Sequence, residues 1–282
     1  MRWEDCTLSF ALFVGIGCHG TTAIFVITPT GIAAGTDQLT KGASPSGKAT
    51  FRKDITKIQL INGKFIVASV GVEQTNAYNF EDWITKVGNK LAPDASVTQF
   101  VGLIENEATK TFKDDMAIEK HMRSGALVKS QPLEDTLVEY IVGGYESGVP
   151  TIIRTYFNLD WHDKRLVGPV RDVDFPASGS NPNVGIKMNG VNCGIQEFTE
   201  VNSYAYKRFH SYFPAILAKV ASGRELTQEE AVTVIRILIS IQAEVTPSQV
   251  GRDSRIVVLR MRGTGTVSSY PDITALPKKT NR

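Results

Sequence analysis

The residues HGTTAIFVITPTGIAAGTDQ, His19–Gln38, carry the strongest strand and turn signals near the start of the chain. They include two apolar runs, Thr22–Ile27 and Gly31–Asp37, separated by the residues TPTG. β-branched residues favour strands, Pro fixes φ, and Gly tolerates the angles of a tight turn. We therefore predict a β-hairpin, with Thr21 just before its first strand and Asp37 at the end of its second.

A second hairpin is predicted a little further along the chain. The run ITKIQLI, Ile55–Ile61, alternates between polar and apolar residues and is followed by Asn62 and Gly63. Asn-Gly between two alternating runs is the strongest short hairpin signal, since both residues accept positive φ. Lys64–Gly71 is the predicted return strand.

The registers of these hairpins predict a cluster of polar side chains. A turn at Pro29-Thr30 places Asp37 beside the two threonines that begin the first strand, and a two-residue loop places Lys57 opposite Ala68, next to Ser69. If the two hairpins pair, then Thr21, Asp37 and Lys57 converge at one end of a sheet.

The rest of the chain predicts an α+β fold in one domain. We expect helices at Tyr78–Leu91, Ser96–Phe112, Val201–Ala221 and Thr227–Glu244, a hairpin about Ser147-Gly148 and a last buried strand at Arg255–Met261. Residues 161–196 show no clear pattern, and the tail after Pro271 is predicted to be loose. Runs of strands that alternate with runs of helices favour packed layers over a βαβ winding.

Composition excludes several classes of partner. The 31 Lys and Arg nearly balance the 29 Asp and Glu and are scattered along the chain, so no nucleic-acid partner is expected. The cysteines and histidines stand in no metal-ligand spacing, so we expect neither a metal ion nor a cofactor.

The first twenty residues are predicted to be a removable leader. Thr7–Gly17 is apolar but too short to span a bilayer, which fits the core of a signal peptide. The basic front end that a signal peptide needs is poor, because Glu4 and Asp5 offset Arg2, so a propeptide or a buried N-terminal element remains an alternative. Cleavage after Gly20 would leave residues 21–282 as one domain. A signal peptide implies an exported, periplasmic protein without a membrane segment, whereas a propeptide implies a cytoplasmic one.

Such a cleavage would give Thr21 a chemical role. A threonine hydroxyl is a poor nucleophile unless a base takes its proton, and the α-amino group of an N-terminal residue, with a pKa of about 8, can be that base. A cation such as Lys57 favours the neutral amine, and Asp37 would hold the lysine in place. Backbone N–H groups near Ala68–Val70, Ser69 among them, would bind the oxyanion.

The pattern GTT…GIAAGTD…TKI resembles that of proteasome β-subunits and HslV-type threonine peptidases, in the N-terminal nucleophile hydrolase superfamily. The resemblance implies cleavage at Gly20, a catalytic Thr21 supported by Asp37 and Lys57, and a four-layer αββα sandwich. It also implies a peptide or small-amide substrate and assembly of identical subunits.

The sequence departs from the family's pattern at several positions. The interval between Asp37 and Lys57 is longer than in the family, so Lys53 is an alternative lysine. The family's Ala-Gly at the oxyanion position is Ala68-Ser69 here. Glu244 and Ser248 stand where the family places an Asp and a Ser that support the amine. The alternative function is a non-catalytic assembly or binding subunit, which retention of residues 1–20 would favour.

Overall fold

The computed structural model describes residues 21–43, 49–52, 56–72, 78–113, 134–160, 163, 165–176, 185–190, 195, 197–247, 250–261 and 265–273. The predicted leader, the alternative lysine Lys53 and the candidate Ser248 lie outside the described residues.

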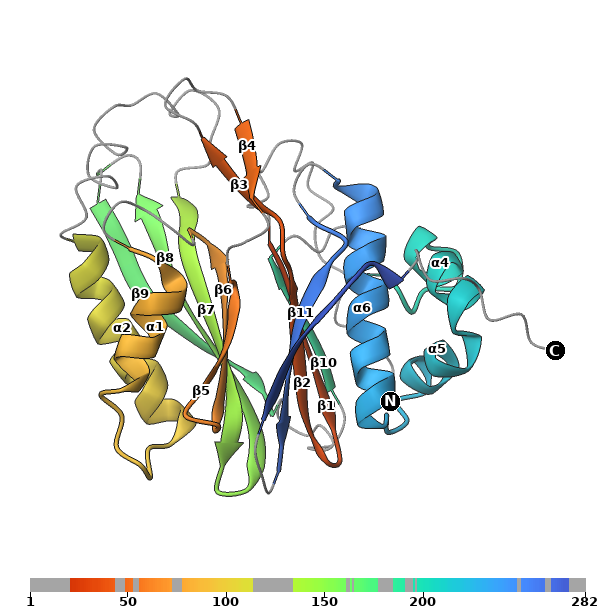
Figure 1. Cartoon of the computed structure of the whole chain (residues 1–282), viewed down its shortest axis with the longest axis horizontal. Helices are drawn as coiled ribbons and strands as arrows, with labels where there is room; N and C mark the ends of the chain where they lie inside the picture. The colour runs from red at the N-terminus through yellow and green to blue at the C-terminus, as the bar shows by residue number, and fades with distance from the viewer. Residues whose placement is uncertain are drawn as a thin grey trace.

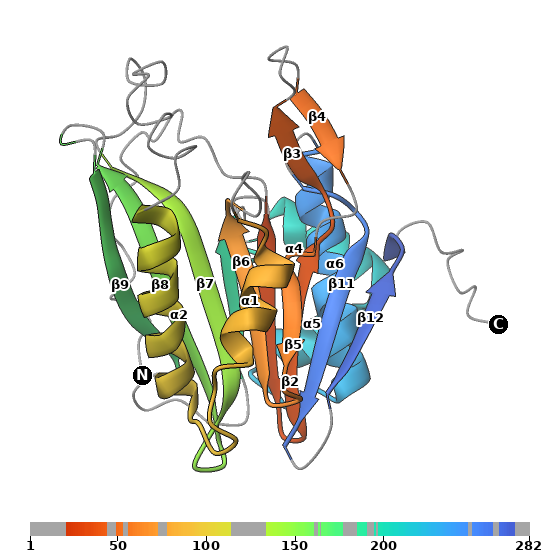
Figure 2. The same ribbon diagram turned by 60° about the vertical axis from the view of Figure 1, so that its left-hand side comes forward.

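Two five-stranded antiparallel sheets form the centre of the molecule. The first sheet has the order β10 (Gly185–Gly190), β1 (Thr22–Thr28), β2 (Gly31–Asp37), β11 (Ser254–Arg260) and β12 (Thr266–Tyr270). The second has the order β5 (Ile58–Ile61), β6 (Phe65–Gly71), β7 (Glu134–Glu146), β8 (Val149–Asp160) and β9 (Arg165–Phe175). A two-stranded ribbon, β3 (Thr40–Ala43) and β4 (Ala49–Arg52), continues from β2 beyond the ends of both sheets (Figure 2).

Helices cover the outer face of each sheet, as Figure 1 shows. The second sheet is covered by α1 (Phe80–Gly88) and α2 (Val97–Lys113). The first sheet is covered by α6 (Gln228–Val245), on which α4 (Tyr204–Tyr212) packs next to α5 (Pro214–Ala221). The predicted α+β class is confirmed.

Strand β1 is apolar from Ala23 to Ile27 because both of its faces are buried. Ala23 and Phe25 lie in the core between the two sheets, whereas Ile24 and Val26 lie in the core beneath α6. Alternate residues of a strand point to opposite faces, so a strand between two buried layers needs apolar residues at every position.

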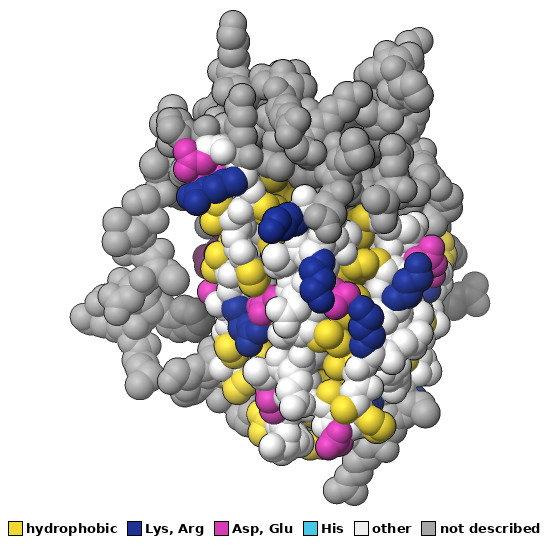
Figure 3. All heavy atoms as spheres, turned by 90° about the vertical axis from the view of Figure 1, so that its left-hand side faces the viewer, with side chains coloured by type: hydrophobic (Ala, Val, Ile, Leu, Met, Phe, Trp, Pro, Cys, Tyr) yellow, Lys and Arg dark blue, Asp and Glu magenta, His cyan; other side chains and the backbone are white. Residues whose placement is uncertain are grey.

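The outer helical face is mixed in charge. On the side that contains α1 and α2, Lys and Arg side chains are interspersed with Asp and Glu (Figure 3). On α2, Glu107 bonds to Lys90 and to Lys110, and these bonds lower the pKa of the Glu107 carboxyl. Such exposed pairs add little to stability, because water competes for both partners.

The first hairpin has the predicted register. Ala23 pairs with Thr36, which places Thr22 opposite Asp37. Strand β11 pairs with the other edge of β2, and its first residue, Ser254, lies opposite Asp37. Asp37 is therefore held from both neighbouring strands.

The second hairpin differs by one residue from the prediction. Ile58, not Lys57, pairs with Ala68, because the loop takes in Lys64 as well as Asn62 and Gly63. Asn62 and Gly63 do adopt positive φ, of 53° and 66°, as the Asn-Gly signal predicted. The two hairpins do not pair with each other, because β1–β2 and β5–β6 belong to different sheets. Their polar ends meet across the space between the sheets.

Five strands escaped the sequence analysis, and the first two are β3 and β4. β9 and β10 lie in the stretch for which no pattern was found, and β12 follows the predicted last strand. The helix predicted over Val201–Ala221 is two helices, because Phe213 leaves the helical region and Pro214 begins α5. Proline lacks the N–H that a continuing helix needs but fits the first turn of a new one.

Candidate active site

Asp37 is a fully buried carboxylate with four hydrogen-bond donors. Its Oδ1 accepts the N–H of Thr22 at 2.9 Å. Its Oδ2 accepts the N–H of Leu39 at 3.0 Å, the N–H of Gly251 at 3.1 Å and the ammonium of Lys57 at 3.2 Å. A carboxylate is costly to bury unless donors satisfy it, and these four donors do so.

Lys57 reaches Asp37 from the opposite sheet. It directly precedes β5, and its ammonium donates both to Asp37 and to the carbonyl oxygen of Leu39. The side chains of Lys57 and Asp37 are both 0% exposed. A buried ion pair of this kind is a weak source of stability, so its presence calls for a reason other than folding.

Thr21 lies beside this pair, directly before β1. It is buried, and strand alternation places it on the face of Ala23, which belongs to the core between the sheets. The bond from the next N–H, that of Thr22, to Asp37 fixes the backbone here. Thr21, Asp37 and Lys57 therefore gather at one end of the two sheets.

Gly190, which the sequence analysis missed, packs directly on Thr21. It pairs with Thr22 and has a φ of +79°. A Cβ at Gly190 would lie 2.1 Å from the carbonyl oxygen of Thr21 and 3.0 Å from Cγ1 of Val70. Only glycine fits, and the end of β6 is thereby shown to lie next to Thr21.

The structure does not leave the Ser69 backbone open for an oxyanion. The N–H of Ser69 donates to the carbonyl oxygen of Lys57 at 2.8 Å, as part of the β5–β6 pairing. The hydroxyl of Ser69 is buried and has no hydrogen-bond partner among the described residues. Its side chain lies on the face of Val67, which packs against the helices and not against the first sheet.

Gly71 ends β6 and lies beyond the residues of β6 that pair with β5. Peptide directions alternate along a strand, so its N–H points to the same side as that of Ser69. Its φ is +103°, and a Cβ there would lie 2.5 Å from the carbonyl oxygen of Leu137. The requirement for glycine is the signal that could have identified this position.

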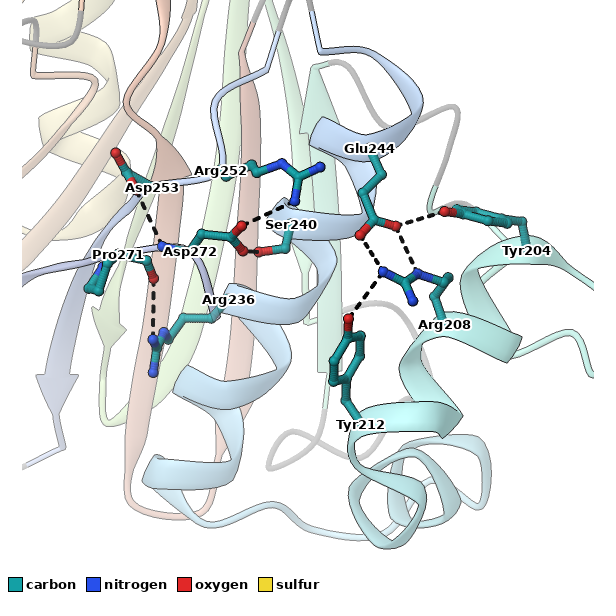
Figure 4. A network of polar contacts seen from close by, with 10 residues as sticks. All are labelled: Tyr204, Arg208, Tyr212, Arg236, Ser240, Glu244, Arg252, Asp253, Pro271 and Asp272. Atoms are coloured by element: carbon teal, nitrogen blue, oxygen red, sulfur yellow. Dashed lines mark hydrogen bonds and ion pairs between the residues drawn. The ribbon is translucent and has the colours of Figure 1, made fainter. Parts of the chain in front are cut away.

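Glu244 does not join the cluster. Its carboxylate accepts bonds from Tyr204, at 2.7 Å, and from the guanidinium of Arg208, and so links α6 to α4 (Figure 4). Burial alone would raise the pKa of Glu244, but the bonds from Arg208 and Tyr204 outweigh it and lower the pKa. The supporting role expected for Glu244 is therefore not what its contacts indicate.

A second buried polar contact crosses between the sheets near Thr21. Nδ2 of Asn189, the neighbour of Gly190, donates to Oε1 of Glu139 at 2.8 Å. Glu139 lies opposite Val70 in the second sheet. Burial raises the pKa of Glu139, although the nearby Arg154 opposes that shift.

A cavity of about 310 Å³ lies at the other end of the sheets, beside the loop between β5 and β6. Its lining includes Phe65, Tyr145 and Leu259, and none of the candidate residues contributes to it. Among the described residues, no group of three or more His, Cys, Asp or Glu side chains is arranged to hold a metal ion. None of the described helices is both long enough and apolar enough to span a membrane.

No family model and no curated protein matches the chain. Solved structures do match. Anbu (ancestral beta-subunit) from Yersinia bercovieri is 12% identical, with a TM-score of 0.46 over 89% of this chain and 88% of that chain. An Anbu (Gly-1) mutant from Hyphomicrobium sp. strain MC1 is 14% identical, with a TM-score of 0.45 over 90% of this chain and 87% of that chain. Anbu from the same strain is 15% identical, with a TM-score of 0.41 over 89% and 87%.

These neighbours correct the resemblance drawn from the sequence motifs. All three are named as Anbu, and none is named as a proteasome β-subunit or as HslV. The assignment to proteasome β-subunits and HslV-type peptidases was therefore wrong. At these identities and TM-scores the similarity carries no argument about the activity of this chain.

Proposed function

We propose that the chain is an N-terminal threonine amidohydrolase that acts on a peptide or a small amide once residues 1–20 have been removed. The observation that carries this proposal is the fully buried pair of Lys57 and Asp37, which is tied through Asp37 to the backbone next to Thr21. We also infer that the layers belong to the αββα type of N-terminal nucleophile hydrolases, with residues 21–282 as one mature domain.

The reaction assigns each group a step. The Thr21 hydroxyl attacks the amide carbonyl carbon while its own α-amino group takes the proton, and that proton passes to the leaving amine. The resulting ester of Thr21 is then hydrolysed by water, which frees the acid product and the threonine hydroxyl. The ammonium of Lys57 favours the neutral, basic form of the amine.

The developing oxyanion needs a donor at the end of β6. We assign this role to the N–H of Gly71 and not to that of Ser69, because the Ser69 N–H is already bonded to Lys57. The Gly71 N–H faces the Lys57 side of the strand. The neighbouring residue Val70 lies against Gly190, which packs on Thr21. A preorganised backbone donor of this kind contributes about 3 kcal/mol to transition-state binding in other hydrolases.

The test begins with the mass and the N-terminal sequence of protein purified from its native host. We expect a chain that starts at Thr21 and hydrolyses short peptides carrying a fluorogenic C-terminal amide. Thr21→Ala is expected to abolish hydrolysis, because the nucleophile is lost, and Thr21→Ser to retain part of it.

Thr28→Ala is the matched control. Thr28 is a buried threonine like Thr21, but it lies at the opposite end of β1, where its hydroxyl donates to the carbonyl oxygen of Gly31. This variant is expected to hydrolyse like the wild type. A native chain that begins anywhere but Thr21, or a Thr21→Ala variant that still hydrolyses, contradicts the proposal and favours a non-catalytic subunit.

The same variant separates the two origins of the leader. If Thr21→Ala keeps residues 1–20, the leader is a propeptide that Thr21 removes. If the leader is still removed, it is a signal peptide cut by another enzyme, and the protein is exported.

A further inference from the structure

The geometry points to Asp272 as a positioning residue that holds Asp37 in place through the segment Val250–Asp253. The inference rests on the proposed function, since it concerns the same site. It involves the chain end that was predicted to be loose after Pro271.

The segment Val250–Asp253 lies directly on the residues that follow β2. The N–H of Gly251 donates to Oδ2 of Asp37, and the N–H of Gln38 donates to the carbonyl oxygen of Asp253, both at 3.1 Å. A Cβ at Gly251 would lie 2.8 Å from Cβ of Leu39. The segment therefore cannot shift without disturbing Asp37 or its neighbours.

Asp272 bonds to this segment and to α6. Its carboxylate accepts a bond from Nη1 of Arg252 at 3.1 Å, and its N–H donates to Oδ1 of Asp253 at 3.3 Å. Its Oδ1 also accepts the hydroxyl of Ser240, a fully buried residue of α6, at 2.7 Å. Figure 4 shows Asp272 between the helix and the segment.

The chain around Asp272 is anchored rather than loose. Arg236 of α6 donates to the carbonyl oxygen of Pro271 at 3.2 Å, and its guanidinium lies 4.9 Å from the centre of the Tyr270 ring. Ile273 is buried in the core that α6 forms with the first sheet. Asp272 is thus held by a helix of the main core on one side and contacts the segment on the other.

Loosening the segment would affect the reaction through Lys57. The N–H groups of Gly251 and Leu39 and the Lys57 ammonium all bond to Oδ2 of Asp37. Loss of the Gly251 bond therefore holds this oxygen less firmly and lets it shift, and the ammonium shifts with it. A positive charge close to the α-amino group of Thr21 disfavours its protonated form. When the Lys57 ammonium lies further away, this effect weakens and the pKa of the α-amino group rises. The rate then reaches its plateau at a higher pH, because the neutral amine is the base.

The experiment compares Asp272→Asn with Arg208→Gln in the mature protein. Asp272→Asn removes the charge that faces Arg252. Arg208→Gln breaks the ion pair with Glu244, which lies on the other side of α6. For Asp272→Asn we expect kcat/KM to fall by about 10-fold, a part of the roughly 100-fold that a 1 Å misplacement costs. The acid limb of its rate–pH profile should move to higher pH, and the amide of Gly251 should exchange hydrogen faster. Arg208→Gln should leave both readouts as in the wild type.

The outcomes separate this inference from the proposed function. If the wild type shows Thr21-dependent hydrolysis but Asp272→Asn keeps the acid limb or the Gly251 exchange rate, the inference is overturned and the proposed function stands. If the wild type shows no such hydrolysis, the proposed function fails, and the positioning of the active site with it. Should Asp272→Asn not fold, Ser240→Ala removes one of the same bonds, and the same two readouts decide.

Discussion

Lys57→Met is expected to abolish hydrolysis and to lower the free energy of unfolding by about 3 kcal/mol. The variant leaves the carboxylate of Asp37 buried without its counterion, although the N–H groups of Thr22, Leu39 and Gly251 still bond to it. Removal of one partner of a buried pair costs about 3–5 kcal/mol, and these three remaining bonds place the expected loss at the lower end. Hydrolysis is lost because the cation that favours the neutral amine is gone.

Urea unfolding and amide hydrolysis at saturating substrate measure the two effects separately. Lys219→Met is the matched control, because Lys219 pairs with Glu230 at 2.6 Å on a half-exposed surface of the helices. We expect it to cost less than about 1 kcal/mol and to leave hydrolysis unchanged. A Lys57→Met variant that hydrolyses like the wild type would contradict the assigned role and turn attention to Lys53.

The local signals of the sequence found the strands that carry the candidate site. The turn TPTG and the Asn-Gly pair identified both hairpins, and arithmetic about the first turn placed Asp37 opposite Thr22, as the structure does. The same arithmetic missed the second register by one residue, because the inclusion of Lys64 in the loop depends on backbone angles that the residue types alone do not determine. The choice of different sheets for the two hairpins depends on contacts with β7 and β11, which are far away in the sequence.

Backbone contacts explain most of what the sequence analysis missed at the site. The N–H of Gly251 donates to Asp37, and the carbonyl oxygen of Leu39 accepts a bond from Lys57. Both are backbone groups, so no sequence motif could reveal them. β10 reads as GIKMNG, with no clear alternation, and is a strand because it pairs with β1. Its glycine at 190 therefore looked like loop composition, although it lies against Thr21.

Gly190→Ala is expected to lower kcat/KM by about 100-fold, because it displaces the nucleophile. The new methyl group would meet the carbonyl oxygen of Thr21, 2.1 Å from the ideal Cβ position, and the backbone of β10 or of Thr21 has to move. Since the φ of +79° is also unfavourable for alanine, we expect the free energy of unfolding to fall by about 3 kcal/mol in total.

Gly63→Ala separates the two causes. Gly63 has a similar φ of +66°, but a Cβ there would meet no atom within 4 Å, and the loop lies at the opposite end of the sheets. This control should lose about 1 kcal/mol from backbone strain alone and should hydrolyse normally. If Gly190→Ala matches Gly63→Ala in both urea unfolding and hydrolysis, the close packing of β10 on Thr21 does not position the nucleophile. If only Gly190→Ala loses hydrolysis, the position of the Thr21 backbone, and not merely its hydroxyl, is what the reaction requires.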